Sequence, residues 1–136
     1  MPSPSPSQRR LLETTARSLA KRAYAPYSRF PVGAAVLAGS GKIYGGCNVE
    51  NASFGLCLCA ERTAVFCAVA AGERSIAAVA VYTATKNPTA PCGACRQVIH
   101  EFGPQALVIC TCEGKARLEE PLAALLPHAF GPTDLA

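Results

Sequence analysis

Residues 8–24 place their hydrophobic side chains at the spacing of a helix. The apolar positions follow one another at intervals of four, three, one and three residues and share one face, which is made by Leu12, Ala16, Leu19, Ala20 and Ala23. Pro26 cannot continue a helix and is expected to end it. The preceding stretch, MPSPSPS, lacks the apolar side chains needed for packing, which predicts a disordered Ser/Pro tail over residues 1–7.

Four short apolar runs predict β-strands, at residues 31–38, 42–47, 76–83 and 106–111. The first two are joined by Gly-Ser-Gly at residues 39–41, which is typical of a tight turn and predicts an antiparallel hairpin. The run at 76–83, IAAVAVYT, is continuously apolar rather than alternating. It is therefore expected to be a central strand that is covered on both faces.

Three further helices are predicted between and after these strands. Residues 59–72 are rich in alanine, contain no proline and close with Gly72 at an expected C-cap. Residues 93–102 carry apolar side chains at i, i+3, i+4 and i+7, and residues 118–126 suggest a short final helix. The element order α, β, β, α, β, α, β, α predicts an α/β domain with a mixed sheet and helices on both faces.

Composition supports one folded domain over residues 8–136. A chain of 136 residues that is 50% hydrophobic and only 16% charged can bury a core, and part of its apolar surface is expected to lie between subunits of a homo-oligomer. The net charge is +4, and six of the thirteen basic residues lie in the first 29 positions. A solvated helix face explains this surplus better than a nucleic-acid surface does.

The cysteine content directs attention to thiol or metal chemistry. No segment reads as a signal peptide or as a membrane span, so a soluble, cytoplasmic protein without a membrane partner is expected. Eight cysteines in such a chain are expected to be thiols, metal ligands or small core residues rather than disulfides.

Two short motifs place cysteines at the starts of predicted helices. PCGAC, at residues 91–95, holds a C-x-x-C pair that by itself suits a zinc site and a redox pair equally well. CLCAER, at residues 57–62, offers Cys57 and Cys59, which would point in nearly opposite directions on a helix, about 200° apart. One of them is therefore the expected third ligand. Three cysteine ligands leave a fourth position open for water, as in a catalytic zinc site.

Glu61 lies in an otherwise apolar predicted helix, just after these cysteines. From there a carboxylate can approach the open coordination position without being a ligand, and can move protons to and from the water. A surface helix residue is the alternative, but the apolar surroundings favour the functional interpretation.

C-A-E at residues 59–61 together with P-C-G-A-C at 91–95 matches the three-cysteine form of the zinc nucleobase deaminase signature, which selects Cys59. From about residue 8 to 134 the chain resembles the small cytidine deaminases, through YSRFPVGAA, GCNVENAS, CAERTA, PCGACRQV and FGPTDL. The resemblance implies a three-layer α/β/α fold with about five strands, the missing one near residues 115–118. It also implies a homotetramer with shared active sites.

The same resemblance implies one zinc ion per subunit, bound by Cys59, Cys92 and Cys95. Water activated by the zinc would add to C4 of cytosine while Glu61 shuttles protons. Cytidine and deoxycytidine would give uridine and deoxyuridine with release of ammonia, as in pyrimidine salvage.

Further site residues follow from the resemblance. Asn48 and Glu50 would hold the ribose, Phe30 would pack on the pyrimidine, and Ala60 would contact the substrate. Phe130 would reach the active site of a neighbouring subunit. Arg62 and Gln97 would support the zinc thiolates, and Cys57 would only pack beside them. Phe54 stands where many relatives have tyrosine.

Three other functions remain as alternatives. A nucleic-acid editing deaminase or binding module would need a longer basic groove and more exposed aromatic residues than this chain offers, since it has no tryptophan. A non-catalytic zinc protein would need a fourth protein ligand and would have no use for Glu61. A deaminase for a modified nucleoside such as blasticidin is the nearest enzymatic rival.

Overall fold

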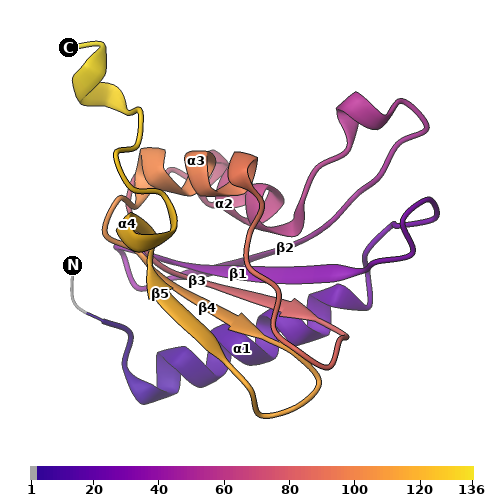
Figure 1. Ribbon diagram of the computed structural model, residues 1–136. Coiled ribbons are helices and arrows are strands. Elements are labelled where there is room, and N and C mark those ends of the chain that lie inside the picture. Colours follow the sequence, from indigo (N-terminus) through magenta and orange to yellow (C-terminus); the bar gives the residue numbers. More distant parts are fainter. Residues whose placement is uncertain (1–2) are drawn as a thin grey trace.

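A mixed five-stranded sheet forms the middle layer of the molecule (Figure 1). The structure is a computed structural model that describes residues 3–136. The strands lie in the order β2-β1-β3-β4-β5; only β3 and β4 are parallel to each other, and the other neighbours are antiparallel. Their bounds are β1 Val32–Ala38, β2 Ile43–Cys47, β3 Ile76–Thr83, β4 Leu107–Thr111 and β5 Leu118–Pro121.

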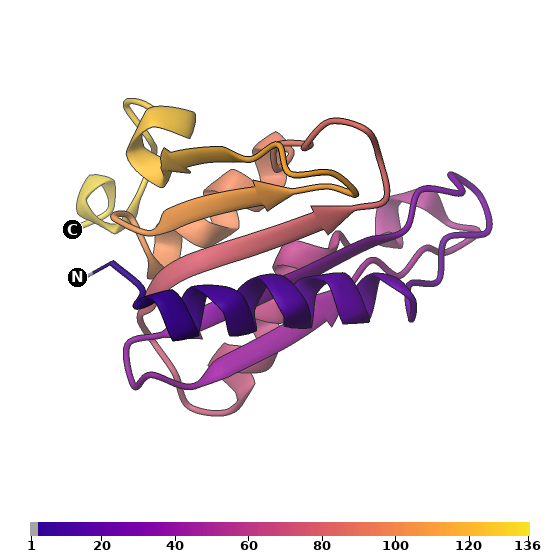
Figure 2. The ribbon, with the colours of Figure 1, turned by 90° about the horizontal axis from the view of Figure 1, so that it is seen from below.

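Helices cover both faces of the sheet, which confirms the predicted three-layer α/β/α architecture. Helix α1 crosses one face, and helices α2 and α3 cover the other (Figures 1 and 2). The helix bounds are α1 Pro6–Ala20, α2 Ala60–Ala70, α3 Gly93–Phe102 and α4 Leu122–Leu125, with short 3-10 turns at η1 Phe54–Leu56 and η2 Pro132–Asp134. Within the described residues, no helix has both the length and the apolar character needed to span a membrane.

Strand β3 is buried along its whole length because the sheet has a hydrophobic core on each side. Successive side chains of a strand point to opposite faces. Val79 and Val81 therefore belong to the core under α2 and α3, whereas Ala78 and Ala80 belong to the core under α1. The prediction of a central strand at 76–83 is confirmed.

The first helix differs from its predicted bounds at both ends. It begins at Pro6 because Ser5 caps it: the Ser5 hydroxyl accepts from the Gln8 backbone N–H at 3.2 Å, and the Gln8 side chain accepts from the Ser5 N–H at 2.9 Å. The predicted disordered tail is therefore wrong for residues 5–7; residues 1–2 lie outside the described residues. The helix ends at Ala20, since the Tyr24 N–H donates to the Asn48 carbonyl instead.

The predicted helix at 118–126 is wrong in its first half. Leu118–Pro121 forms β5, which pairs antiparallel with β4, and only Leu122–Leu125 is helical. The fifth strand implied by the resemblance thus exists, slightly later in the chain than expected. The other predicted elements are confirmed, each within two residues at either end.

Gly33 allows α1 to lie directly against β1. A Cβ at this position would come within 1.8 Å of the Ala16 carbonyl oxygen and 2.6 Å of the Ala20 nitrogen, both of which are backbone atoms that cannot turn away. The close approach of helix and sheet therefore requires a residue without a side chain.

We expect Gly33→Ala to lower the free energy of unfolding by about 1–3 kcal/mol, because overpacking would push α1 off the sheet. Urea denaturation measures this change. Gly55→Ala is the control, since a Cβ at Gly55 meets nothing within 4 Å. Equal stability of the two variants would contradict the packing argument.

Candidate active site

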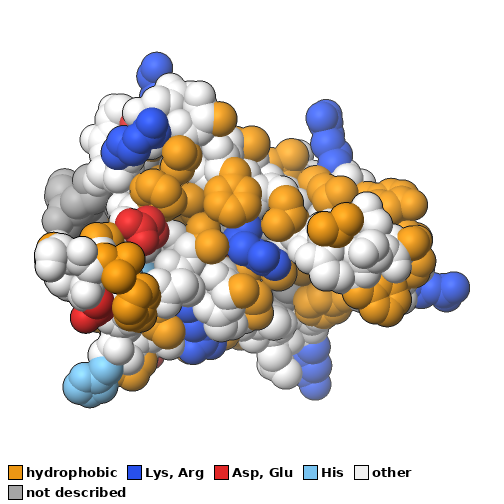
Figure 3. Space-filling view, turned by 90° about the horizontal axis from the view of Figure 1, so that it is seen from above, with side chains coloured by type: hydrophobic (Ala, Val, Ile, Leu, Met, Phe, Trp, Pro, Cys, Tyr) orange, Lys and Arg blue, Asp and Glu red, His pale blue; other side chains and the backbone are white. Residues whose placement is uncertain are grey.

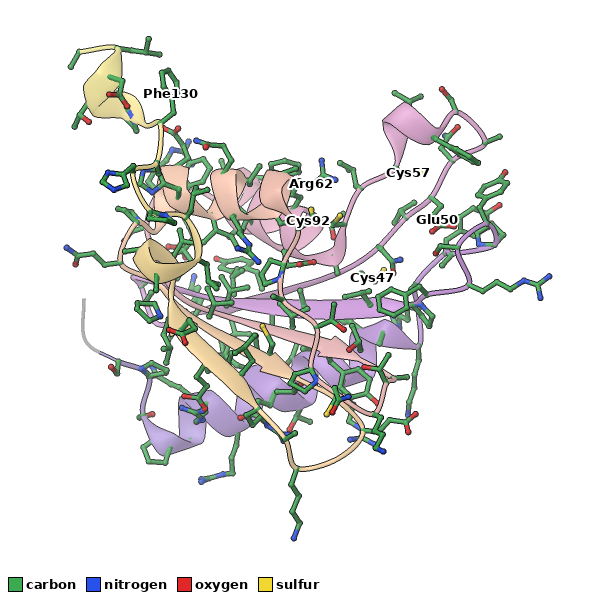
Figure 4. The ribbon with its side chains drawn as sticks, in the orientation of Figure 1. Cys47, Glu50, Cys57, Arg62, Cys92 and Phe130 are labelled. Carbon is green, nitrogen blue, oxygen red and sulfur yellow. The ribbon has the colours of Figure 1, made fainter. Side chains whose placement is uncertain are left out.

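Three of the eight cysteines meet where helices α2 and α3 begin (Figure 4). Cys59 is the N-cap of α2, Cys92 is the N-cap of α3, and Cys95 lies in the first turn of α3. The Sγ atoms of Cys59 and Cys92 are 3.8 Å apart, those of Cys92 and Cys95 are 3.4 Å apart, and all three lie within 4.8 Å of one another. The structure therefore brings together the three cysteines predicted as ligands.

This donor set suits zinc. Thiolates are preferred zinc ligands, and sulfur atoms at these separations can bind one ion. Free backbone N–H groups and the positive end of the helix dipole favour ionised sulfur at each helix start. Three protein ligands also leave one coordination position for water, which is the arrangement of catalytic rather than structural zinc sites.

Cys57 lies outside the cluster, as predicted, but for a different reason. Helix geometry would separate the two sulfurs only if the helix included Cys57, whereas α2 begins at Ala60. Leu58 pairs with Val49 in an isolated bridge, and the Cys57 sulfur accepts from the Asn51 backbone N–H at 3.3 Å. This turn of the chain, rather than helix geometry, separates the two sulfurs.

Arg62 stabilises the thiolate form of Cys59. Its Nη2 donates to the Cys59 Sγ at 3.3 Å. Hydrogen bonds from Cys95 and Arg62 lower the pKa of Cys59 to about 5, against the opposing effect of burial. The pKa of Cys95 is raised, because its thiol donates to Cys59 and is buried. The Arg62 Nε is buried without a hydrogen-bond partner among residues 3–136, so the guanidinium keeps an unused donor in this region.

Glu61 is a buried carboxyl group beside the thiols. It is only 4% exposed, and burial raises its pKa to about 7. A carboxyl group with a pKa near neutrality can both accept and release protons during a reaction. The structure thus rules out the alternative of a solvated surface glutamate.

A cavity of about 290 Å³ opens onto Glu61 and onto two of the three thiols, those of Cys59 and Cys92. We call it the metal-site cavity. Its lining includes seven residues that the sequence singles out, which are Phe30, Asn48, Glu50, Cys59, Ala60, Glu61 and Cys92. The rest of the lining is Ser28, Val32, Val81, Thr83, Thr89 and Ala90.

Asn48 fixes one wall of this cavity. Its Nδ2 donates to the Phe30 carbonyl at 2.9 Å, and its Oδ1 accepts from the Val32 N–H at 2.8 Å. An amide group has a second donor and a second lone pair. Asn48 can therefore hold the Phe30 segment in place and still bind a ligand.

Glu50 is held by the loop that precedes Phe30. Its carboxylate accepts from the N–H groups of Tyr27 and Ser28 at 2.9 and 3.1 Å, and from the Ser28 hydroxyl. The Ser28 hydrogen bond lowers the pKa of Glu50, which keeps the carboxylate ionised. The same Ser28 oxygen accepts from the Phe30 N–H at 3.1 Å. One hydroxyl thus connects the carboxylate with the aromatic wall.

Sequence reasoning did not single out two residues that position the site. Ser28 is one. The other is Arg96, which donates through Nε to the Pro91 carbonyl and through Nη1 to the Leu125 carbonyl, each at 2.8 Å. Arg96 thereby ties the residue before Cys92 to helix α4. The only sign of this role in the sequence is the position of Arg96 next to Cys95. Both of its hydrogen-bond acceptors are backbone carbonyls, which every residue carries and which therefore leave no sequence pattern.

Two predicted residues lie away from the metal-site cavity within this chain. The Gln97 amide nitrogen donates to the Phe130 carbonyl at 2.7 Å rather than to a zinc-site thiol. Phe130 lies at the opposite end of the α2 and α3 face from Glu50, and its side chain is 59% exposed (Figure 4).

Comparison with known proteins agrees with this site. The family described as "Cytidine and deoxycytidylate deaminase zinc-binding region" matches residues 6–111. A cytidine deaminase of Sporosarcina psychrophila is 51% identical over 117 residues, which cover 85% of this chain and 86% of that protein.

Solved structures show the same agreement. The crystal structure of cytidine deaminase from Burkholderia pseudomallei has 51% identity and a TM-score of 0.85, covering 89% of this chain and 98% of that one. The enzyme of Mycobacterium tuberculosis has 41% identity and a TM-score of 0.78, covering 90% and 97%. The chain belongs to the zinc-binding cytidine and deoxycytidylate deaminase family, which confirms the resemblance seen in the sequence.

Removing the Arg62 guanidinium should weaken zinc binding. We expect Arg62→Gln to lower zinc affinity by about 10–100-fold, the usual effect of losing a partner of a metal ligand. Competition with a chromogenic chelator measures it. Arg74→Gln is the matched control, because within residues 3–136 the Arg74 side chain donates only to the carbonyls of Val69 and Glu73. Unchanged zinc affinity in Arg62→Gln would refute the role given to this side chain.

Proposed function

We propose that this protein catalyses the zinc-dependent hydrolytic deamination of cytidine and deoxycytidine to uridine and deoxyuridine, with release of ammonia. The observation that carries this proposal is one cavity bordered by two of the three clustered thiols, a buried carboxyl group and a polar pair, Asn48 and Glu50. One zinc ion per subunit would be held by Cys59, Cys92 and Cys95.

Glu61 is the proton carrier in this proposal. When bound, the zinc ion supplies a polarised water as the nucleophile. Glu61 accepts a proton at its carboxylate and delivers it to N3 of the pyrimidine as oxygen adds to C4. The same carboxylate then accepts a second proton, from the hydroxyl group added at C4, and passes it to the departing amine as the C4–N bond breaks and the C4 carbonyl forms. Its pKa of about 7 suits both directions of transfer.

The opposite end of the cavity suits a sugar. Glu50 and Asn48 offer acceptors and a donor for ribose hydroxyl groups, and Phe30 offers an apolar surface for the pyrimidine. Ala60 lines the cavity next to Glu61 and leaves room for the ring. No lysine or arginine is among the residues that line the cavity in the described part of the chain. A free nucleoside is therefore favoured over a nucleotide.

A homotetramer with shared active sites extends the proposal. Hydrophobic side chains spread over the face formed by α2 and α3 (Figure 3), and several large ones are exposed, including Phe54, Leu56, Phe66 and Phe130. Such surface is typical of subunit contacts. Phe130, which Gln97 anchors through its carbonyl, would complete the cavity of a neighbouring subunit. The eight free thiols fit a cytoplasmic location, where thiols stay reduced.

The first experiment compares cytidine, deoxycytidine, CMP and single-stranded DNA as substrates of wild type and Glu61→Ala. We expect wild type to turn over the two nucleosides only. Glu61→Ala should keep its zinc and lose at least about 100-fold in kcat, since general acid–base catalysis contributes that much or more. Equal turnover of CMP would refute the substrate assignment, and an active Glu61→Ala would refute the mechanism.

Ser28→Ala tests whether the Ser28 hydroxyl positions Glu50 and Phe30. We expect KM for cytidine to rise about 10-fold with little change in kcat, because a hydrogen bond to a charged group is lost. Ser28→Thr, which keeps a hydroxyl, should restore KM. Ser53→Ala removes an exposed hydroxyl nearby and serves as control. An increase in KM shared by both alanine variants would contradict the positioning role.

Phe130→Ala tests the shared site. We expect kcat/KM for cytidine to fall by about 10-fold or more while zinc content is unchanged, because a large aromatic contact would be lost. Leu135→Ala, at another exposed residue of the C-terminal segment, should behave as wild type. Light scattering gives the oligomeric state of each variant. A fully active wild-type monomer would disprove the shared site.

A further inference from the structure

A second cavity lies on the other side of the sheet, between α1 and the β4–β5 connection. Its volume is about 330 Å³. Helix α1 packs mainly on β1, β2 and β3, so in the described part of the chain no helix fills the space beside it over β4 and β5 (Figure 2). We call it the arginine cleft, because its lining includes three arginines and one glutamate, namely Arg10, Arg17, Arg117 and Glu13.

Two of these arginines share one side of α1. Arg10 and Arg17 are seven residues apart, which brings them within about 20° of each other around the helix and about 10 Å apart along it. The Arg17 guanidinium carbon lies 5.1 Å from the centroid of the Tyr82 ring, and this contact holds the charge over the floor of the cleft.

The charge of these two groups is not neutralised by the protein. Glu13 already pairs with Arg117 at 2.9 Å and with Arg9 at 3.5 Å. Arg9 also pairs with Glu119. Within residues 3–136, no carboxylate pairs with Arg10 or Arg17. The cleft therefore carries excess positive charge and two guanidinium groups with free donors.

The two threonine hydroxyls in the cleft are already used as donors. Thr14 donates to the Arg10 carbonyl at 2.8 Å, and Thr111 donates to the Val81 carbonyl at 3.0 Å. The charged donors left for a ligand are the guanidinium groups, which bind phosphate and carboxylate oxygens in a bidentate manner.

We propose that the arginine cleft is a binding site for a small polyanion that carries phosphate groups. Two free guanidinium groups match more than one negative charge, which a single carboxylate does not provide. A cavity of 330 Å³ also exceeds what one phosphate ion needs, so a ligand with several phosphates or a phosphorylated small molecule fits best. A nucleic-acid strand would need a longer track of basic residues.

Calorimetric titration of the zinc-loaded protein with inorganic tripolyphosphate tests this site. We expect one tripolyphosphate per subunit, and weaker binding of inorganic phosphate. Arg10→Gln/Arg17→Gln should lower the tripolyphosphate affinity by about 10-fold or more, because two charge-assisted interactions are lost. The matched control is Lys21→Gln/Arg22→Gln, which removes two charges from exposed residues just after α1 and outside the cleft.

Three results would overturn the proposal. The first is that wild type does not bind tripolyphosphate, and the second is that both double variants lose the same amount of tripolyphosphate affinity. The third is that a single-stranded oligonucleotide binds more tightly than tripolyphosphate and loses affinity equally in both double variants. Thermal unfolding and zinc content, measured before and after each titration, ensure that every variant is folded and that zinc has not been extracted. Neither measurement depends on the proposed deaminase activity.

Discussion

The site depends on one constraint, which is that the N-termini of helices α2 and α3 lie next to each other. Three sulfur atoms can bind one ion only if Cys59 on α2 and the cysteines of α3 lie within a few ångströms of each other. Gly46 allows this on one side, since a Cβ there would come within 2.5 Å of the Ala64 backbone nitrogen in α2. Arg96 secures the other side by fixing the carbonyl of Pro91.

Electrostatics follows from this geometry. Three thiolates around Zn²⁺ carry a net negative charge, which weakens the polarisation of a bound water unless nearby donors compensate. Arg62 supplies such a donor to Cys59, while Glu61 is kept in an apolar, buried position where its pKa rises. The adjacent residues Glu61 and Arg62 thus lie in different surroundings, because successive helix residues point in different directions.

The sheet separates two regions of different chemistry. Along β3, Val81 and Thr83 line the metal-site cavity, whereas Tyr82 between them lies under Arg17 in the arginine cleft. The two charged residues that line the first cavity are glutamates, whereas three of the four charged residues that line the second are arginines. Because successive side chains of a strand point to opposite faces of the sheet, neighbouring residues of one buried strand can line cavities of opposite charge.

The sequence by itself determined the elements with strong local signals and the chemistry of the site. The glycine turn fixed the hairpin, the continuous apolar run fixed β3, and the two cysteine motifs with Glu61 identified a zinc deaminase. The end of α1 and the strand β5 depended on partners distant in sequence, Asn48 and β4, that no local pattern contains. The roles of Ser28 and Arg96, and the arginine cleft, were likewise decided only by tertiary structure, because each arises from contacts between segments that folding alone brings together.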